Sequence, residues 1–118
     1  MKKYLLLLQL FLLPSCQGDS PCKISVENFG KYLIVKVQNI SDKTVTLAAQ
    51  GHSISFAVKK KMGSWTYDMN NMTKRSGHVK LIAGEEKTIR KFISKYDKQL
   101  KYKLELICNG DKVETEEF

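Results

Sequence analysis

The chain has 118 residues, 42% of them hydrophobic and 27% charged, with 20 basic and 12 acidic side chains and a formal net charge of +8. This length fits one small domain with a single hydrophobic core. The basic excess is spread along the chain and is not aligned with stacking aromatic residues or with a nucleic-acid-binding module, so we predict no nucleic-acid partner.

Residues 1–15 have the pattern of an export signal. Lys2 and Lys3 precede an apolar run from Tyr4 to Leu13 that only Gln9 interrupts. A helix needs about 20 residues to cross roughly 30 Å of hydrocarbon, and this run is too short for that. The pattern therefore indicates a cleaved signal peptide and an exported chain.

The end of this segment, Leu13-Pro14-Ser15-Cys16, resembles the lipobox of bacterial lipoprotein precursors, with Leu at −3, a small residue at −1 and Cys at +1. In that family the cysteine is diacylated and becomes the new N-terminus. The resemblance implies lipidation at Cys16, a linker over residues 16–21, and a protein held to a membrane of the cell envelope. The alternative is a eukaryotic secreted protein that is cut after Gly18.

Two further sequence patterns bear on these alternatives. Asn39-Ile40-Ser41 and Asn71-Met72-Thr73 match the N-glycosylation acceptor pattern and fit the eukaryotic alternative. Under either alternative Cys22 and Cys108 remain, and an oxidising compartment favours a disulfide between them. Neither cysteine has a CxxC neighbour or a histidine at ligand spacing, so no metal site is predicted.

The rest of the chain shows short segments with alternating apolar residues, separated by turn residues. The predicted strands are 22–27, 32–38, 44–48, 53–58, 65–67, 79–81, 88–93, 102–108 and 112–116. A bend is expected over residues 59–64, and the longest predicted loop is 68–77. Segment 88–93 also permits a helix, because its apolar residues do not share one strand face. Asn109-Gly110 is a strong hairpin signal.

Many short strands without a convincing amphipathic helix predict an antiparallel sandwich or barrel. The sequences NxSDKxV, LxAGEE and YKLELxC, as they stand here, resemble the immunoglobulin-like domains of bacterial envelope lipoproteins and of small proteinase-inhibitor-type sandwiches. The resemblance covers Lys23 to Glu116. It implies an all-β fold, an immunoglobulin-like antiparallel β-sandwich over residues 22–118.

Side chains that could support catalysis are few. His52 and His78 have no partner at triad or metal-ligand spacing, and hydrolase, metalloprotease and phosphate-loop motifs do not occur. Adjacent carboxylates such as Glu85 and Glu86 are typical of a solvated turn. We therefore predict that the protein is not an enzyme and uses no cofactor.

Trp65 and Tyr67 would share one face of a strand. Trp65 could fill the core of the sandwich, or both aromatic residues could anchor a partner protein. The predicted partner-binding residues lie in this region and in the one compact lysine cluster: Trp65, Tyr67, Met72, Lys74, Arg75, Lys59, Lys60 and Lys61. The predicted function is to bind another macromolecule in the envelope. The alternative is an inhibitor or immunity-type protein that blocks a secreted enzyme by inserting a loop.

Overall fold

The computed structural model describes residues 20–118, so the predicted signal peptide and the predicted lipidation site at Cys16 lie outside the described residues. Ten strands and one short 3₁₀ helix, Met69–Asn71, form in this range. The strands are β1 (Cys22–Asn28), β2 (Tyr32–Asn39), β3 (Val45–Gln50), β4 (Ser53–Ile54), β5 (Ala57–Met62), β6 (Ser64–Tyr67), β7 (Gly77–Leu81), β8 (Glu86–Phe92), β9 (Tyr102–Cys108) and β10 (Asp111–Glu114). The all-β prediction is confirmed.

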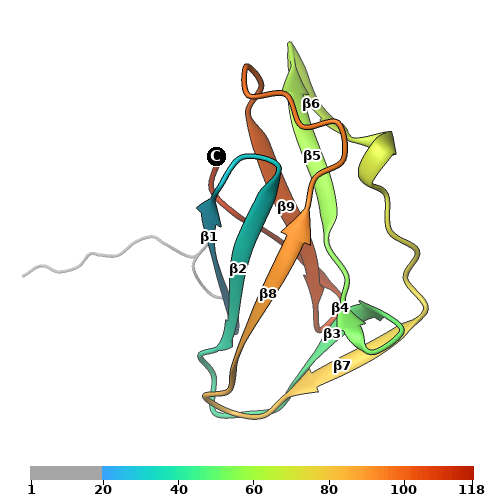
Figure 1. Cartoon of the computed structure of the whole chain (residues 1–118). Helices are drawn as coiled ribbons and strands as arrows, with labels where there is room; N and C mark the ends of the chain where they lie inside the picture. The colour runs from blue at the N-terminus through green and yellow to red at the C-terminus, as the bar shows by residue number, and fades with distance from the viewer. Residues whose placement is uncertain (1–19) are drawn as a thin grey trace, which may run out of the picture.

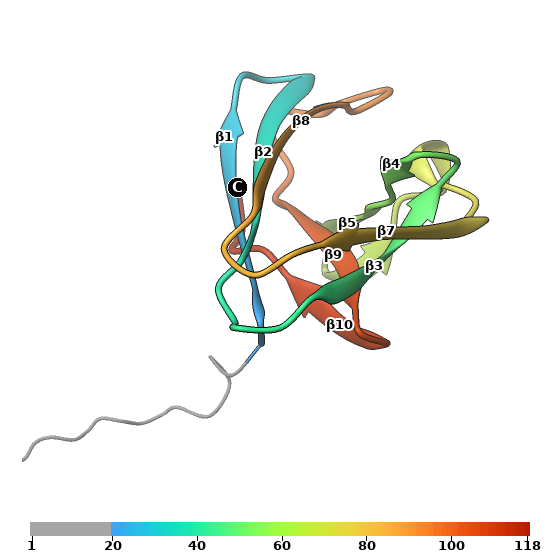
Figure 2. The same cartoon turned by 90° about the horizontal axis from the view of Figure 1, so that it is seen from below.

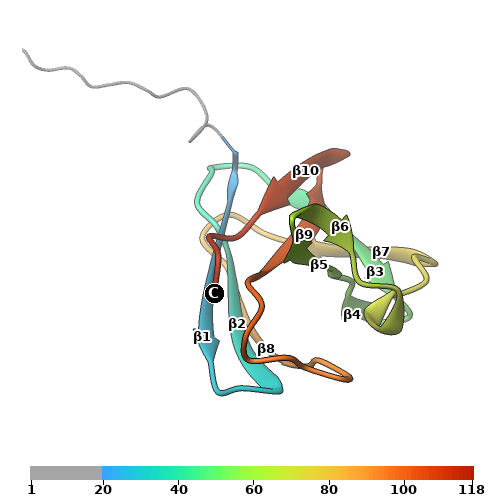
Figure 3. The ribbon, with the colours of Figure 1, turned by 90° about the horizontal axis from the view of Figure 1, so that it is seen from above.

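The strands form two antiparallel sheets (Figure 1). The smaller sheet has the order β1-β2-β8, and the larger has the order β4-β3-β9-β5-β6, with β10 paired to β9 and β7 paired to β3. Views from below and from above show the two sheets facing each other, as in a β-sandwich (Figures 2 and 3). The predicted arrangement of two facing antiparallel sheets is therefore present.

Strand β9 is the centre of the larger sheet. Glu105 pairs with Ala57 of β5 and with Glu114 of β10, so β5 and β10 flank β9 on opposite sides. Cys108 pairs in the same way with Leu47 of β3 and with Asp111 of β10. Strands β3 and β5 therefore share one side of β9, each covering part of its length.

Alternating residues of the two sheets form the core. The central strands β2 and β9 contribute six fully buried side chains: Leu33, Val35, Val37, Tyr102, Leu104 and Leu106. Burying a Leu or Val side chain stabilises a fold by about 1.5–3 kcal/mol relative to leaving it exposed. The period-two spacing of the sequence thus gives each strand one apolar face, and these faces meet between the sheets.

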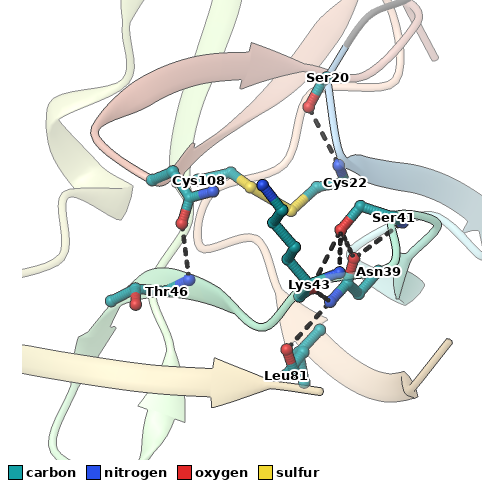
Figure 4. The surroundings of a disulfide bond; sticks show 9 residues. Ser20, Cys22, Asn39, Ser41, Lys43, Thr46, Leu81 and Cys108 are labelled. Carbon is teal, nitrogen blue, oxygen red and sulfur yellow. Dashed lines mark hydrogen bonds between the residues drawn. A yellow bond between two sulfur atoms is a disulfide. The ribbon is translucent and has the colours of Figure 1, made fainter. Parts of the chain in front are cut away.

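A disulfide between Cys22 and Cys108 joins the two sheets (Figure 4). Cys22 begins β1 and Cys108 ends β9, and both are buried. This confirms the predicted pairing. The bond closes a loop with a sequence separation of 86 residues and restricts nearly the whole domain in the unfolded state.

The predicted hairpin at Asn109-Gly110 is also confirmed. It joins β9 to β10, and both turn residues have positive φ, 52° at Asn109 and 86° at Gly110. Type I′ turns require this conformation at both central positions, and Asn-Gly adopts it readily. The backbone amide of Asn109 donates to the carbonyl oxygen of Thr46, and the side-chain oxygen of Asn109 accepts from the backbone amide of Thr46. These two bonds tie the turn to the start of β3.

One sequence-based expectation needs correction, and one open alternative is decided. Residues 59–62 continue β5, so the bend expected over 59–64 is confined to the turn at Gly63, which has φ +79°. Strand β8 contains residues 88–92 of the predicted strand 88–93, which confirms a strand in this segment and rules out the helical alternative. Its apolar pattern is imperfect because β8 is an edge strand with Lys87 and Lys91 on the inward face beside Ile89. Burial lowers the pKa of Lys91.

Candidate protein-interaction face

The β5–β6 hairpin presents a continuous outer surface. Its register sets Lys61 opposite Trp65 and Lys59 opposite Tyr67, and cross-strand partners point to the same side of a sheet. Lys59 is also opposite Lys103 of β9. We call this surface the hairpin face, defined by Lys59, Lys61, Trp65, Tyr67 and Lys103.

Trp65 is not part of the core. Its side chain is half-buried on the hairpin face, and the ammonium group of Lys103 lies 4.7 Å from its ring centroid. The Lys59 ammonium lies 5.2 Å from the ring centroid of Tyr67 in the same way. The core alternative for Trp65 is therefore wrong, because the β5–β6 pairing turns it away from the smaller sheet. Each ring instead makes a cation–π contact with a lysine.

A buried carboxylate organises the hairpin face. Glu105 of β9 is 1% exposed. The Tyr67 hydroxyl donates to its carboxylate and lies 3.0 Å from each of the two oxygens. Lys59 Nζ lies 3.3 Å from Glu105 Oε2, and Arg75 Nη2 lies 3.7 Å from Oε1. A buried charge is tolerated only when it is paired and hydrogen-bonded. Glu105 therefore links β5, β6 and the following loop to the central strand.

Lys59 also pairs with Glu114 of β10. The hydrogen bond that Lys59 donates to Glu114, assisted by Glu105 and opposed by partial burial, raises the pKa of Lys59. The hydrogen bond from Lys59, followed by the attraction of Lys103, lowers the pKa of Glu114 against the opposing effect of burial. Both side chains stay charged over the neutral range, so Lys59 is held in place between β9 and β10.

The loop between β6 and β7 is braced from inside. Asn71 is buried, donates to Asp68 and to the carbonyl oxygen of Ser94, and accepts from the amide of Ser94. Thr73 donates to the carbonyl oxygen of Phe56. Because Asn71 and Thr73 point inward, Met72 between them points outward and is 50% exposed. The loop therefore presents Met72 from a fixed backbone.

The predicted partner-binding residues do not form one patch. Trp65, Tyr67, Lys59 and Lys61 lie on the hairpin face. Lys60 alternates to the opposite side of β5 and lies 3.7 Å from Asp68, which is 2% exposed. The side chains of Met72 and Lys74 are exposed on the loop, and Arg75 contacts Glu105.

The sequence analysis missed the burial of Glu105, and the structure also exposes two further methionines in this region. Glu105 stands in an apolar strand sequence, where alternation predicts an outward position but not burial. The methionines Met62 and Met69 are 61% and 77% exposed, at the tip of the hairpin and in the 3₁₀ helix. With Met72 they give the region three exposed thioether side chains, which pack adaptably against partners.

A separate aromatic cluster lies on the smaller sheet. Phe29 stacks on Tyr32 with ring centroids 5.3 Å apart, and Phe92 lies 6.1 Å from Tyr32 on its other side. The Arg90 guanidinium lies 4.9 Å from the Tyr32 ring centroid. Phe29 and Phe92 are 53% and 60% exposed, so this cluster is a second exposed apolar surface that the sequence analysis did not identify.

The asparagine of each glycosylation pattern is buried and hydrogen-bonded within the fold. The two amide hydrogens of Asn39, which is 0% exposed, bond the carbonyl oxygens of Lys43 and Leu81 at 2.6 and 3.0 Å (Figure 4). Those of Asn71 bond Asp68 and Ser94 at 2.8 and 3.0 Å. A glycan replaces one amide hydrogen and needs space, so modification at either residue is incompatible with this packing.

Over residues 20–118 no group of three or more His, Cys, Asp or Glu side chains could hold a metal ion. The side chains of His52 and His78 are both exposed. No helix in this range is long and apolar enough to cross a membrane.

Comparisons with known proteins add no assignment. A scan against protein-family models, a search of curated proteins and a search of solved structures found no match to this chain.

Proposed function

We propose that this chain is a lipid-anchored protein of the bacterial cell envelope whose non-catalytic, immunoglobulin-like β-sandwich binds a protein partner through the hairpin face. One observation carries the proposal of binding. Two aromatic rings, Trp65 and Tyr67, lie on an outward sheet surface with a lysine against each, and the segment that follows β6 carries the exposed methionines Met69 and Met72. Aromatic residues and methionine are enriched at protein interfaces.

Strand order supports the immunoglobulin-like assignment. In that fold, strands A, B and E are neighbours in one sheet and strands C, F and G in the other. The order β1-β2-β8 corresponds to A-B-E, and the order β3-β9-β10 corresponds to C-F-G. This chain differs in that its disulfide joins β1 to β9, where antibody domains join B to F, and in that β5 and β6 are added beside β9.

The charges of the hairpin face favour an acidic partner. Lys61 is exposed at the rim, and Lys103 lies over Trp65. The carboxylate of Glu105 is buried beneath them and already paired. A partner would therefore meet ammonium groups around two rings, which complement a surface with Asp or Glu side chains around an apolar centre.

The position of β1 is consistent with an anchor at Cys16. Cys22 is bonded to Cys108 at the end of β9, whereas the tip of the β5–β6 hairpin lies beyond the start of β9 (Figure 1). A strand of seven residues spans roughly 20 Å. A lipid attached shortly before β1 would thus lie at the end of a single copy opposite the tip of its β5–β6 hairpin.

Capture of partners from envelope extracts tests the binding proposal. The variant Trp65→Ala/Met69→Ala/Met72→Ala should lose most of the captured partner, because hot spots of an interface concentrate in a few aromatic and apolar side chains. Phe92→Ala, on the aromatic cluster of the other sheet, is the matched control and should retain capture. Circular dichroism shows whether each variant is folded. Full capture by the folded triple variant would contradict the proposal.

The anchor is tested separately. Labelling with a fatty-acid analogue should mark the full chain and should not mark Cys16→Ala. Equal labelling of both proteins, or of neither, would remove the anchor and favour a secreted protein. This outcome would leave the hairpin-face proposal untouched, because capture does not depend on the lipid.

A second candidate, an inhibitor or immunity-type protein, is favoured by the braced loop. Inhibitors present a preorganised loop, which lowers the entropy lost on binding. Asn71→Ala should loosen the loop and weaken inhibition of a captured enzyme more than it weakens capture by the hairpin face. If the captured partner has no activity that the chain inhibits, this candidate fails.

A further inference from the structure

The outer edge of β1 is unpaired within residues 20–118. β1 is the outermost strand of the smaller sheet, and its register with β2 runs through seven consecutive residue pairs without a bulge. Two bonds that flank this ladder show which backbone groups face β2: Phe29 N to Tyr32 O, and Ile40 N to Pro21 O. Because groups alternate along a strand, the even-numbered residues Cys22 to Asn28 direct their amide and carbonyl groups to the free edge.

Three other edge strands, β8, β4 and β6, are protected in ways that β1 is not. β8 carries the inward-facing lysines Lys87 and Lys91, while β4 and β6 have only two and four residues. Inward-facing charges and short strands are known means of preventing edge-to-edge pairing. β1 has seven residues, no proline, and the partly buried apolar residues Ile24 and Val26 on its inner face. A long regular edge of this kind is a template for another strand.

The outer-face charges of β1 are self-complementary. Lys23, Ser25 and Glu27 are exposed on the outer face, with a cation and an anion at equal distances from the central serine. We propose that β1 pairs antiparallel with β1 of a second copy about a two-fold axis at Ser25. Lys23 then lies opposite the partner's Glu27, and Glu27 lies opposite the partner's Lys23. Opposite charges at such cross-strand positions are stabilising.

Backbone geometry selects the same register. With Ser25 on the axis, Ile24 lies opposite the partner's Val26, and both are even-numbered residues whose amide and carbonyl groups point to the edge. These two residues can therefore exchange both hydrogen bonds, and the symmetric pair does the same. A shift by two residues separates both Lys–Glu pairs and shortens the ladder. A shift by one residue places an even-numbered residue, whose amide and carbonyl groups point to the free edge, opposite an odd-numbered residue, whose groups point to β2. Such a pair cannot exchange hydrogen bonds.

The groove next to this edge fits the same arrangement. It has a volume of about 330 Å³, and its lining includes Ile24 and Val26 of β1 and residues 115–118. In the dimer the partner's Val26 and Ile24 extend the inner apolar face of the sheet across the mouth of this groove. The result is a continuous six-stranded sheet, which is a common size. Both hairpin faces stay free because they belong to the other sheet.

Cysteine cross-linking tests the pairing in cells that produce the full chain. Ser25 and the partner's Ser25 lie opposite each other on the two-fold axis and exchange no backbone hydrogen bonds with each other. The Cα atoms of such a pair are about 4.5 Å apart, which is close enough for a disulfide. Ser25→Cys should therefore give a dimer that reductant dissolves. Lys36→Cys is the matched control, because Lys36 lies opposite Ser25 on β2 and is also exposed. Its symmetry mate would be three strand spacings away, roughly 14 Å, so it should not cross-link.

A charge swap tests the register. In the Ser25→Cys chain, Lys23→Glu or Glu27→Lys alone should lower the cross-linked fraction roughly tenfold at limiting concentration, because like charges meet twice. The combination Lys23→Glu/Glu27→Lys should restore it. The proposal is overturned if Ser25→Cys gives no cross-link or if Lys36→Cys cross-links equally. It is also overturned if the charge swap does not restore the cross-linked fraction. An intact Cys22–Cys108 disulfide shows that each variant is folded, and partner capture by the hairpin face is read independently.

Discussion

The Tyr67 hydroxyl donates to the carboxylate of Glu105, 3.0 Å from each of its two oxygens. One residue ends the short strand β6 and the other lies in the middle of β9, 38 positions further along the chain. The contact holds the hairpin against the central strand and places the rings of the hairpin face. The same carboxylate also receives Lys59 and Arg75, so the face is built around one buried charge.

Removing this contact should weaken the fold. Tyr67→Phe deletes a hydrogen bond to a charged group, and we expect a loss of about 1–2 kcal/mol in the free energy of unfolding. In a double-mutant cycle with Glu105→Gln, the coupling measured by urea denaturation should be about 1 kcal/mol. Thr66→Ala, on the opposite face of β6, should change stability by less than about 0.5 kcal/mol. Additive effects of the two substitutions would show that the contact contributes nothing.

The Lys59–Glu114 pair predicts a pH dependence. The pKa of Glu114 is lowered, so its contribution to stability is present above the ordinary value of 4.5 and is lost as pH falls through the folded-state value. The pKa of Lys59 is raised, so its contribution is present below the ordinary value of 10.5 and is lost as pH rises through the folded-state value.

Unfolding of Glu114→Gln at several pH values measures this effect. The variant should be less stable than the natural chain by about 0.5–1 kcal/mol between those two ordinary values, a modest figure because the pair is partly solvated. The difference should shrink towards low pH. A constant difference down to strongly acidic pH would show that Glu114 acts through packing and not through its charge.

The disulfide should contribute a large share of the stability. Cys22→Ala/Cys108→Ala is expected to lower the free energy of unfolding by about 2–5 kcal/mol, because the longest loop in the domain is no longer closed in the unfolded chain. Cys16→Ser, which leaves this pair intact, is the control for loss of a cysteine. An unchanged denaturation midpoint in the double variant would contradict this expectation.

Asn39 should be among the least replaceable residues. Asn39→Asp removes both amide donors and turns a carboxylate towards the carbonyl oxygens of Lys43 and Leu81, so we expect a loss of at least about 3 kcal/mol. Asn28→Asp is the matched control, because exposed Asn28 only accepts a hydrogen bond from Gly30 and an aspartate can do the same. Similar unfolding curves for the two variants would refute the structural role of Asn39.

Local signals in the sequence determined much of the fold. Alternating apolar residues predicted the strands, the Asn-Gly pair predicted the β9–β10 turn, and the two cysteines that follow the predicted export segment predicted the disulfide. Each of these signals depends on the chemistry of neighbouring residues or on a bond that only two side chains can form. They needed no knowledge of which strands pair.

Tertiary structure alone decided which surfaces are covered. Alternation placed Glu105 outward, but the β5–β6 hairpin that buries it is positioned by pairing β5 with β9, far apart in sequence. The same pairing carried β5 straight through residues 59–62 and turned Trp65 out of the core, against its bulk and apolar character. Burial depends on which segment lies against a side chain. Where that segment is distant in sequence, the local pattern cannot reveal it.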